Sequence, residues 1–129
     1  MPFDQPLEPQ EVLSRFIFSS KDFSAPQNRV KHGAFLPSKE PLETSVSRTV
    51  GLGLAEVQAI GTLVGESRAT ALKAWGDVVV EDVLAIGLGV RPDAIPERHA
   101  AIIGWPELKD EQISLAQELA AAATLRLPA

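Results

Sequence analysis

The sequence predicts an α+β fold, a small mixed sheet with two main helices packed on it. Short apolar runs that alternate or carry β-branched residues recur along the chain, and such runs are typical of strands. Residues 54–65 and 110–124 instead repeat their apolar side chains at helical spacing, which predicts one buried stripe on each. Because strands and helices interleave, we expect one domain over residues 1–129.

The first half of the chain predicts an arm, a short helix and a hairpin. Residues 1–9 are acidic and rich in proline, and we expect a loose N-terminal arm there. Val12 and Phe16 are four residues apart, which predicts a helix over 11–18. Residues 29–36 alternate and stop at Pro37, and 44–50 are β-branched, so the two segments are expected to pair as a hairpin.

The second half predicts the elements that complete the sheet. After the helix over 54–65 we expect a strand within 71–80, a short helix over 81–86 and a strand over 99–105. Residues 90–93 should be extended, because Pro92 disfavours helix at Arg91. The helix over 110–124 should pack on the sheet. The inward positions predict one common core, formed by Leu54, Val57, Ile60, Val64, Ile102, Ile113, Ala116 and Leu119.

Composition limits the class of protein. The chain has 129 residues, 45% of them hydrophobic, enough to bury one core without a disulfide or structural metal. It has no cysteine, which excludes disulfides and cysteine-ligated zinc and suits the cytoplasm. Residues 1–9 lack the basic and apolar regions of a secretory signal. We therefore expect a soluble cytoplasmic protein without a membrane segment.

The charge distribution is uneven. The net charge of −5 argues against general nucleic-acid binding, which needs a positive surface for the phosphates. From Arg15 to Arg48, however, basic residues outnumber acidic ones. This excess predicts either a local anion-binding face or a solvated loop with scattered charges.

Two features of the sequence bear on cofactor or metal binding. Gly51 and Gly53 precede a helix, as in dinucleotide-binding turns, but Glu56 stands where a third glycine belongs. A carboxylate there repels phosphate, so the segment reads as an ordinary turn. The only histidines, His32 and His99, have no second histidine four residues away, as helical metal motifs require. The sequence therefore predicts no cofactor and no metal.

The best candidate site joins three separate segments. If the hairpin forms and a third strand follows it, their basic side chains share one face, where guanidinium groups suit a phosphate or carboxylate. In this arrangement Trp105 either stacks on a ligand or fills the core, and Arg48 either faces the site or pairs with an acidic neighbour. The predicted ligand-binding residues are Lys31, His32, Arg48, Arg98, His99 and Trp105.

The same segments carry a resemblance. Lys-His-x-Ala-Phe-x-Pro, Ser-Val-x-Arg and Pro-x-Arg-His-Ala-x-Ile-x-Gly-Trp-Pro, followed by an alanine-rich helix, resemble a family of small uncharacterised bacterial proteins. The resemblance runs from Val30 to Leu125. In similar sequences an aromatic residue often precedes the arginine of the second motif, whereas Ser47 stands there in this chain. The resemblance implies a bacterial protein and no catalytic residue.

The expected function is a small binding or interaction module whose partner is another protein or a small anionic ligand. The alternative is an enzyme that acts on a phosphate-containing substrate. In that case His99 would act as acid or base, and Arg48 and Arg98 would hold the anion.

Overall fold

A six-stranded antiparallel sheet forms the centre of the structure, a computed structural model that describes residues 5–129. The strand order is β6-β7-β4-β1-β5-β8, and β2 and β3 form a separate small sheet. The strands are β1 (Val12–Ile17), β2 (Phe23–Ser24), β3 (Arg29–Val30), β4 (Thr44–Arg48), β5 (Ala74–Val79), β6 (Gly89–Pro92), β7 (His99–Ile103) and β8 (Thr124–Arg126). The helices are α1 (Leu54–Ser67), α2 (Val80–Ala85) and α3 (Lys109–Ala122), with 3₁₀ turns η1 (Ser20–Asp22) and η2 (His32–Ala34).

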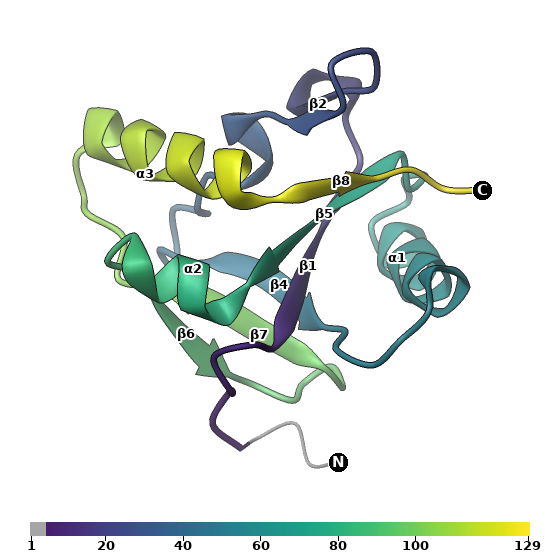
Figure 1. Cartoon of the computed structure of the whole chain (residues 1–129), viewed down its shortest axis with the longest axis horizontal. Coiled ribbons are helices and arrows are strands. Elements are labelled where there is room, and N and C mark those ends of the chain that lie inside the picture. The colour runs from purple at the N-terminus through teal and green to yellow at the C-terminus, as the bar shows by residue number, and fades with distance from the viewer. Residues whose placement is uncertain (1–4) are drawn as a thin grey trace.

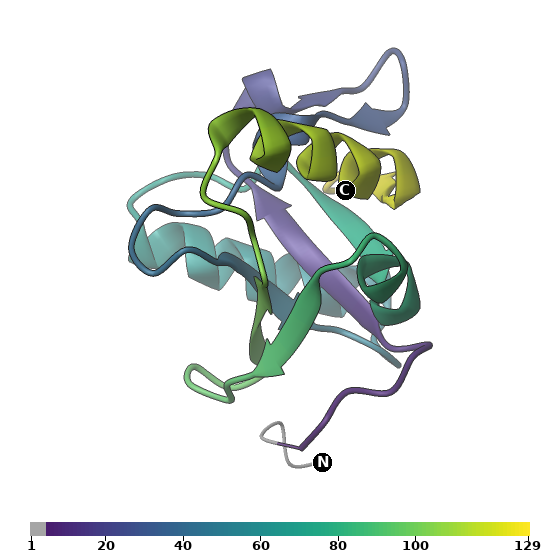
Figure 2. The same cartoon turned by 90° about the vertical axis from the view of Figure 1, so that its left-hand side faces the viewer.

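The helices lie on opposite sides of the large sheet. Figure 1 shows α1 on one side and α2 and α3 on the other, and the turned view of Figure 2 places α1 behind the sheet and α2 in front of it. The predicted α+β class with two main helices is therefore confirmed. Within residues 5–129, no helix is long and apolar enough to cross a bilayer.

One side of the sheet, which we call the closed face, is covered along its whole width. Here α2, α3 and η2 pack on β1, β4, β5 and β7 around one large apolar cluster. Trp105 belongs to this cluster, is 6% exposed and donates its indole N–H to the Ile102 carbonyl at 3.1 Å. The central side chains of the cluster are Leu13, Ile17, Phe35, Val78, Ile102 and Leu119.

The other side carries a second, smaller cluster under α1. Val57 of α1 packs here against Phe16 of β1 and Trp75 of β5, with Ile60 and Val64 at its border. Gly61 lets the helix approach closely, because a Cβ at that position would lie 2.6 Å from the Phe16 ring. α1 therefore rests on β1 and β5.

The prediction of one common core is wrong, because the sheet separates its members. Val57 lies in the α1 cluster, whereas Ile102, Ala116 and Leu119 lie in the closed-face cluster. Leu54 begins α1 at the surface with 57% of its area exposed. Ile113 is only half-buried.

Two predicted elements of the first half are also wrong. Residues 11–18 form β1 instead of a helix: this central strand buries Leu13 on one face and Phe16 on the other, so it lacks the alternation of a half-exposed strand. The hairpin does not exist, since β4 pairs with β1 and β7, and residues 29–36 give only β3 and η2.

The remaining predicted elements are confirmed with small shifts of their ends. They are the strands of 44–50, 71–80, 90–93 and 99–105 and the helices of 54–65, 81–86 and 110–124. β8 was not predicted.

The predicted N-terminal arm is partly described. Residues 1–4 lie outside the described residues. The Gln5 carbonyl accepts a hydrogen bond from Arg48 Nη1 at 2.9 Å, and the Pro9 carbonyl accepts one from the Glu81 amide at 2.8 Å. Residues 5–9 are thus attached to the domain at both ends.

Candidate functional site

The structure separates most of the predicted site residues. Trp105 fills the closed-face core, and Lys31 and His32 lie at η2, which packs toward α3. Arg98 and His99 are the two that line one and the same groove.

Arg48 does not reach that groove. Its side chain is 1% exposed and pairs with Glu11, Nε lying 2.5 Å from Oε1 and Nη2 lying 3.1 Å from Oε2. Ser47 is the residue opposite His99 in the β4–β7 register. Because successive strand residues point to opposite faces, Arg48 points away from the face that carries His99. The prediction that Arg48, Arg98 and His99 share one surface is therefore wrong for Arg48.

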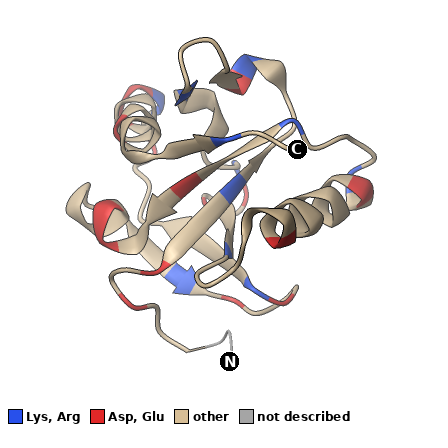
Figure 3. Cartoon of the chain, turned by 45° about the vertical axis from the view of Figure 1, so that its right-hand side comes forward, with Lys and Arg blue, Asp and Glu red and all other residues tan. Residues whose placement is uncertain are grey.

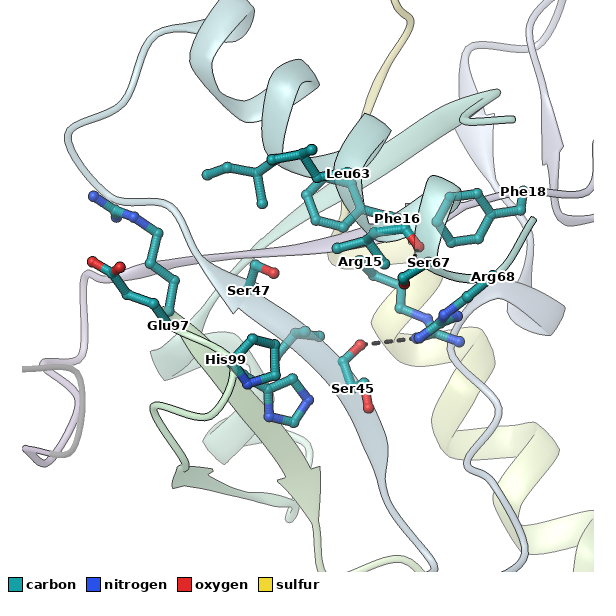
Figure 4. A pocket seen from close by; sticks show the side chains of 15 residues that line it. Arg15, Phe16, Phe18, Ser45, Ser47, Leu63, Ser67, Arg68, Glu97 and His99 are labelled. Atoms are coloured by element: carbon teal, nitrogen blue, oxygen red, sulfur yellow. Dashed lines mark hydrogen bonds between the residues drawn. The ribbon is translucent and has the colours of Figure 1, made fainter. Parts of the chain in front are cut away.

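A groove of about 530 Å³ lies between α1 and the half of the sheet that α1 leaves uncovered. Figure 4 shows Leu63 and Ser67 of α1 and the following residue, Arg68, on one side, and Glu97 and His99 on the other. The floor includes Ser45 and Ser47, which share one face of β4. The groove is otherwise strongly apolar near the helix, with Phe16, Phe18, Ile60, Leu63 and Val64 in its wall.

Arg15 lies where two neighbouring strands diverge. The pairing of β1 with β4 covers only Leu13 with Arg48 and Ser14 with Ser47, so the carbonyl groups beyond it have no strand partner there. Arg15 donates from Nη1 to the Ser45 carbonyl at 2.9 Å, drawn in Figure 4, and from Nε to the Ala34 carbonyl at 2.7 Å. The guanidinium thereby closes the gap and also lines the groove.

The charge of Arg15 is poorly compensated. Burial lowers the pKa of Arg15 to about 10, with the positive charge of Arg68 acting in the same direction and the negative charge of Asp22 opposing both. Among residues 5–129, no carboxylate lies within ion-pair distance of Arg15 or Arg68. Arg68 itself lies over the Phe18 ring, 5.5 Å from the centroid. One end of the groove therefore carries two positive charges without an ion-paired carboxylate among the described residues, with Asp22 offsetting part of the charge of Arg15.

The opposite end is formed by the turn before β7. Arg98 has a left-handed backbone (φ 72°), held by the hydrogen bond of 2.7 Å from the Arg48 amide to the Arg98 carbonyl. His99 Nδ1 lies 2.8 Å from Asp93 Oδ2, and the histidine side chain is 18% exposed. Asp93 orients the imidazole, whose other nitrogen remains available for a ligand.

The two arginines near α1 were not among the predicted site residues. Arg15 was counted only in the basic segment, whose members lie on separate elements, as the scattered blue segments of Figure 3 show. One signal was present in the sequence: a single charge inside the apolar run Val-Leu-Ser-Arg-Phe-Ile of β1. Such a buried charge needs a specific partner.

The search for similar proteins gives no relative from which a role could be transferred. No protein-family model, curated protein or solved structure matches this chain. The resemblance of the segment from Pro96 to Pro106 to a bacterial family stays a prediction. Within residues 5–129, no three potential metal-ligating side chains come together.

Proposed function

We propose that this protein is a small cytoplasmic binding module, from a bacterium, that holds an anionic ligand in the groove beside α1. One observation carries the proposal. Arg15 brings a partly desolvated positive charge into an apolar groove, Arg68 adds a second charge, and no described carboxylate lies within ion-pair distance of either. A desolvated charge is costly unless it is paired, and a bound anion supplies the pair.

The apolar walls of the groove strengthen the interaction of Arg15 with an anion. Apolar walls exclude water and lower the local dielectric constant, so a charge-assisted hydrogen bond there is stronger than at an open surface. The size of the groove, about 530 Å³, falls in the range of small-molecule sites. A small anion fits these properties better than a protein surface does, because Trp105, the aromatic residue of the predicted site, is buried and offers no apolar surface to a partner.

Titration calorimetry with benzoate and phenyl phosphate tests the proposal, with neutral benzamide as the reference. We expect at least one anion to bind and benzamide to bind at least tenfold more weakly, the effect of losing a charge-assisted hydrogen bond. Arg68→Gln should weaken anion binding about threefold to tenfold, as partly exposed ion pairs do. Arg29→Gln is the matched control, since it removes the same charge from an exposed strand outside the groove.

Two results would contradict the proposal. The first is that neither anion binds at millimolar concentration. The second is that Arg68→Gln and Arg29→Gln weaken binding equally, which would point to a general effect of net charge.

A second candidate is an enzyme that uses His99 as acid or base on a phosphate-containing substrate. The hydrogen-bonded pair of His99 and Asp93 at the groove favours it, because a carboxylate that orients an imidazole is a common catalytic arrangement. Turnover of p-nitrophenyl phosphate that is lost in His99→Gln and retained in His32→Gln would support this candidate. Absence of turnover in a protein that still binds benzoate would contradict the enzyme and favour the binding module.

A further inference from the structure

We infer that the ligand of the groove is a monocarboxylate with an unbranched apolar tail, its head at Arg15 and Arg68 and its tail between α1 and the turn before β7. The inference rests on the proposed function and specifies the ligand. It joins two observations: Arg15 and Arg68 form a positively charged end of the groove near the end of α1, and apolar side chains of α1 and β1 line the groove beside them.

The apolar side chains favour a tail instead of a bare ion. Leu63 of α1 lines the groove although 65% of its area is exposed. Phe16 of β1 and Phe18, just beyond the end of β1, line the same space. A bare inorganic anion would leave this apolar surface in water, whereas an alkyl chain would cover it.

The direction of α1 favours a single negative charge on the head. Ser67 and Arg68, which line the groove, mark the C-terminal end of α1. The helix dipole places partial negative charge at that end. Phosphate sites typically use the opposite, N-terminal end, where backbone amides point at the anion. The charged end of this groove therefore suits a carboxylate better than a phosphate dianion.

The donors that remain match the shape of a carboxylate. Arg15 uses Nε for the Ala34 carbonyl and one Nη1 hydrogen for the Ser45 carbonyl. A guanidinium has five N–H groups, so Arg15 keeps donors beyond these two. The Arg68 guanidinium has no hydrogen bond to another described residue and adds its own planar set of donors. Two guanidinium groups can thus hold the two oxygens of one carboxylate.

The experiment titrates the full chain with butanoate, hexanoate, octanoate and decanoate below their micelle concentrations. The affinity should rise about fourfold for each methylene that enters the groove, and the gain should stop once the groove is filled. Octylamine and octan-1-ol, which have the same tail and no anionic head, should bind at least tenfold more weakly than octanoate. Octyl phosphate should bind more weakly than octanoate as well.

A pair of surface variants locates the tail. Leu63→Ser should weaken octanoate about fivefold and butanoate much less, because it removes apolar contact along the tail. Leu84→Ser is the control: Leu84 is 50% exposed on α2, which contributes no residue to the groove, and octanoate affinity should not change. Both substitutions lie at exposed positions, so folding should be retained.

The outcomes separate this inference from the proposed function. If benzoate or phenyl phosphate binds through Arg68 but affinity in the alkyl series does not depend on chain length, the inference of an apolar tail is wrong and the proposed anion site is retained. If octyl phosphate binds tighter than octanoate, the carboxylate head is wrong. If an acidic peptide binds and no alkyl carboxylate does, the groove is a protein-docking site and the inference fails. If no anion of any kind binds, the proposed function fails with it.

Discussion

The contact between β1 and β4, which we call the β1–β4 seam, has a desolvated arginine at each end, and the charge of each is compensated differently. At one end the strands are paired, and buried Arg48 is balanced by Glu11, which comes from a position 37 residues away. At the other end the strands diverge, and Arg15 finds two backbone carbonyls but no described carboxylate at ion-pair distance. Hydrogen bonds occupy two of the five N–H donors of Arg15, while its charge remains.

This difference separates a structural arginine from a binding one. We call the end of the seam at Arg48 the closed end and the end at Arg15 the open end. At the closed end the ion pair of Arg48 with Glu11 is complete, so no ligand is needed to balance the charge. Arg15 ties the diverging strands together and presents an unbalanced charge to the groove, where a ligand can complete the pair. Variants at both ends test whether the contrast holds.

The largest expected effect is at the closed end. Glu11→Ala should lower the free energy of unfolding by about 3–5 kcal/mol, because it leaves the charge of Arg48 buried without its carboxylate. Urea unfolding followed by circular dichroism measures this loss. The double variant Glu11→Leu with Arg48→Met should recover most of it, since a buried pair can be replaced by packed apolar groups. A loss below 1 kcal/mol in Glu11→Ala would mean that the two seam ends are alike.

The next effect concerns the close packing of α1 on β1. Gly61→Ala places a Cβ within 2.6 Å of the Phe16 ring, so α1 must move outward. Overpacking of this kind should cost about 1–3 kcal/mol of unfolding free energy and widen the groove. Ala59→Gly at an exposed position of the same helix is a control for propensity alone. An unfolding free energy unchanged in Gly61→Ala would refute the close packing of α1 on β1.

A smaller loss of stability is expected at the open end. Arg15→Met removes the donors to the Ala34 and Ser45 carbonyls but also removes a desolvated charge whose pKa is already lowered. The two effects oppose each other, and we expect a net loss of about 1–2 kcal/mol. Anion binding by calorimetry should disappear in the same variant. If Arg15→Met destabilises as much as Glu11→Ala while benzoate still binds, Arg15 is structural and the contrast between the ends is wrong.

The parts of the fold that could be predicted from the sequence are those with a local pattern. The helices of 54–65 and 110–124 were predicted because a repeat of 3.6 residues is a local property. β1 was not, because a strand buried on both faces shows no alternation, and the spacing of Val12 and Phe16 also fits a helix. The error in β1 removed the central strand of the sheet and replaced it by a false hairpin.

The candidate site depended on that missing strand. Without β1, nothing in the sequence joined Glu11 to Arg48, and nothing placed Arg15 beside α1. Arg98 and His99 were found because they lie together in one short segment, and their groove partners were missed because they lie on three other elements. Contacts between distant residues depend on strand order, which local patterns do not contain.

The smallest effect on stability is expected at the rim of the open end. Arg68 is exposed, and its side chain contacts the Phe18 ring without an ion pair to any described residue, so Arg68→Gln should change the unfolding free energy by no more than about 0.5 kcal/mol. Its effect should appear in the response of binding to salt. Raising the salt concentration screens partly exposed charges, so benzoate affinity of the natural chain should fall with added sodium chloride, and less steeply in Arg68→Gln. Equal slopes in the two proteins would show that Arg68 takes no part, and that Arg15 alone distinguishes the open end of the seam from the closed one.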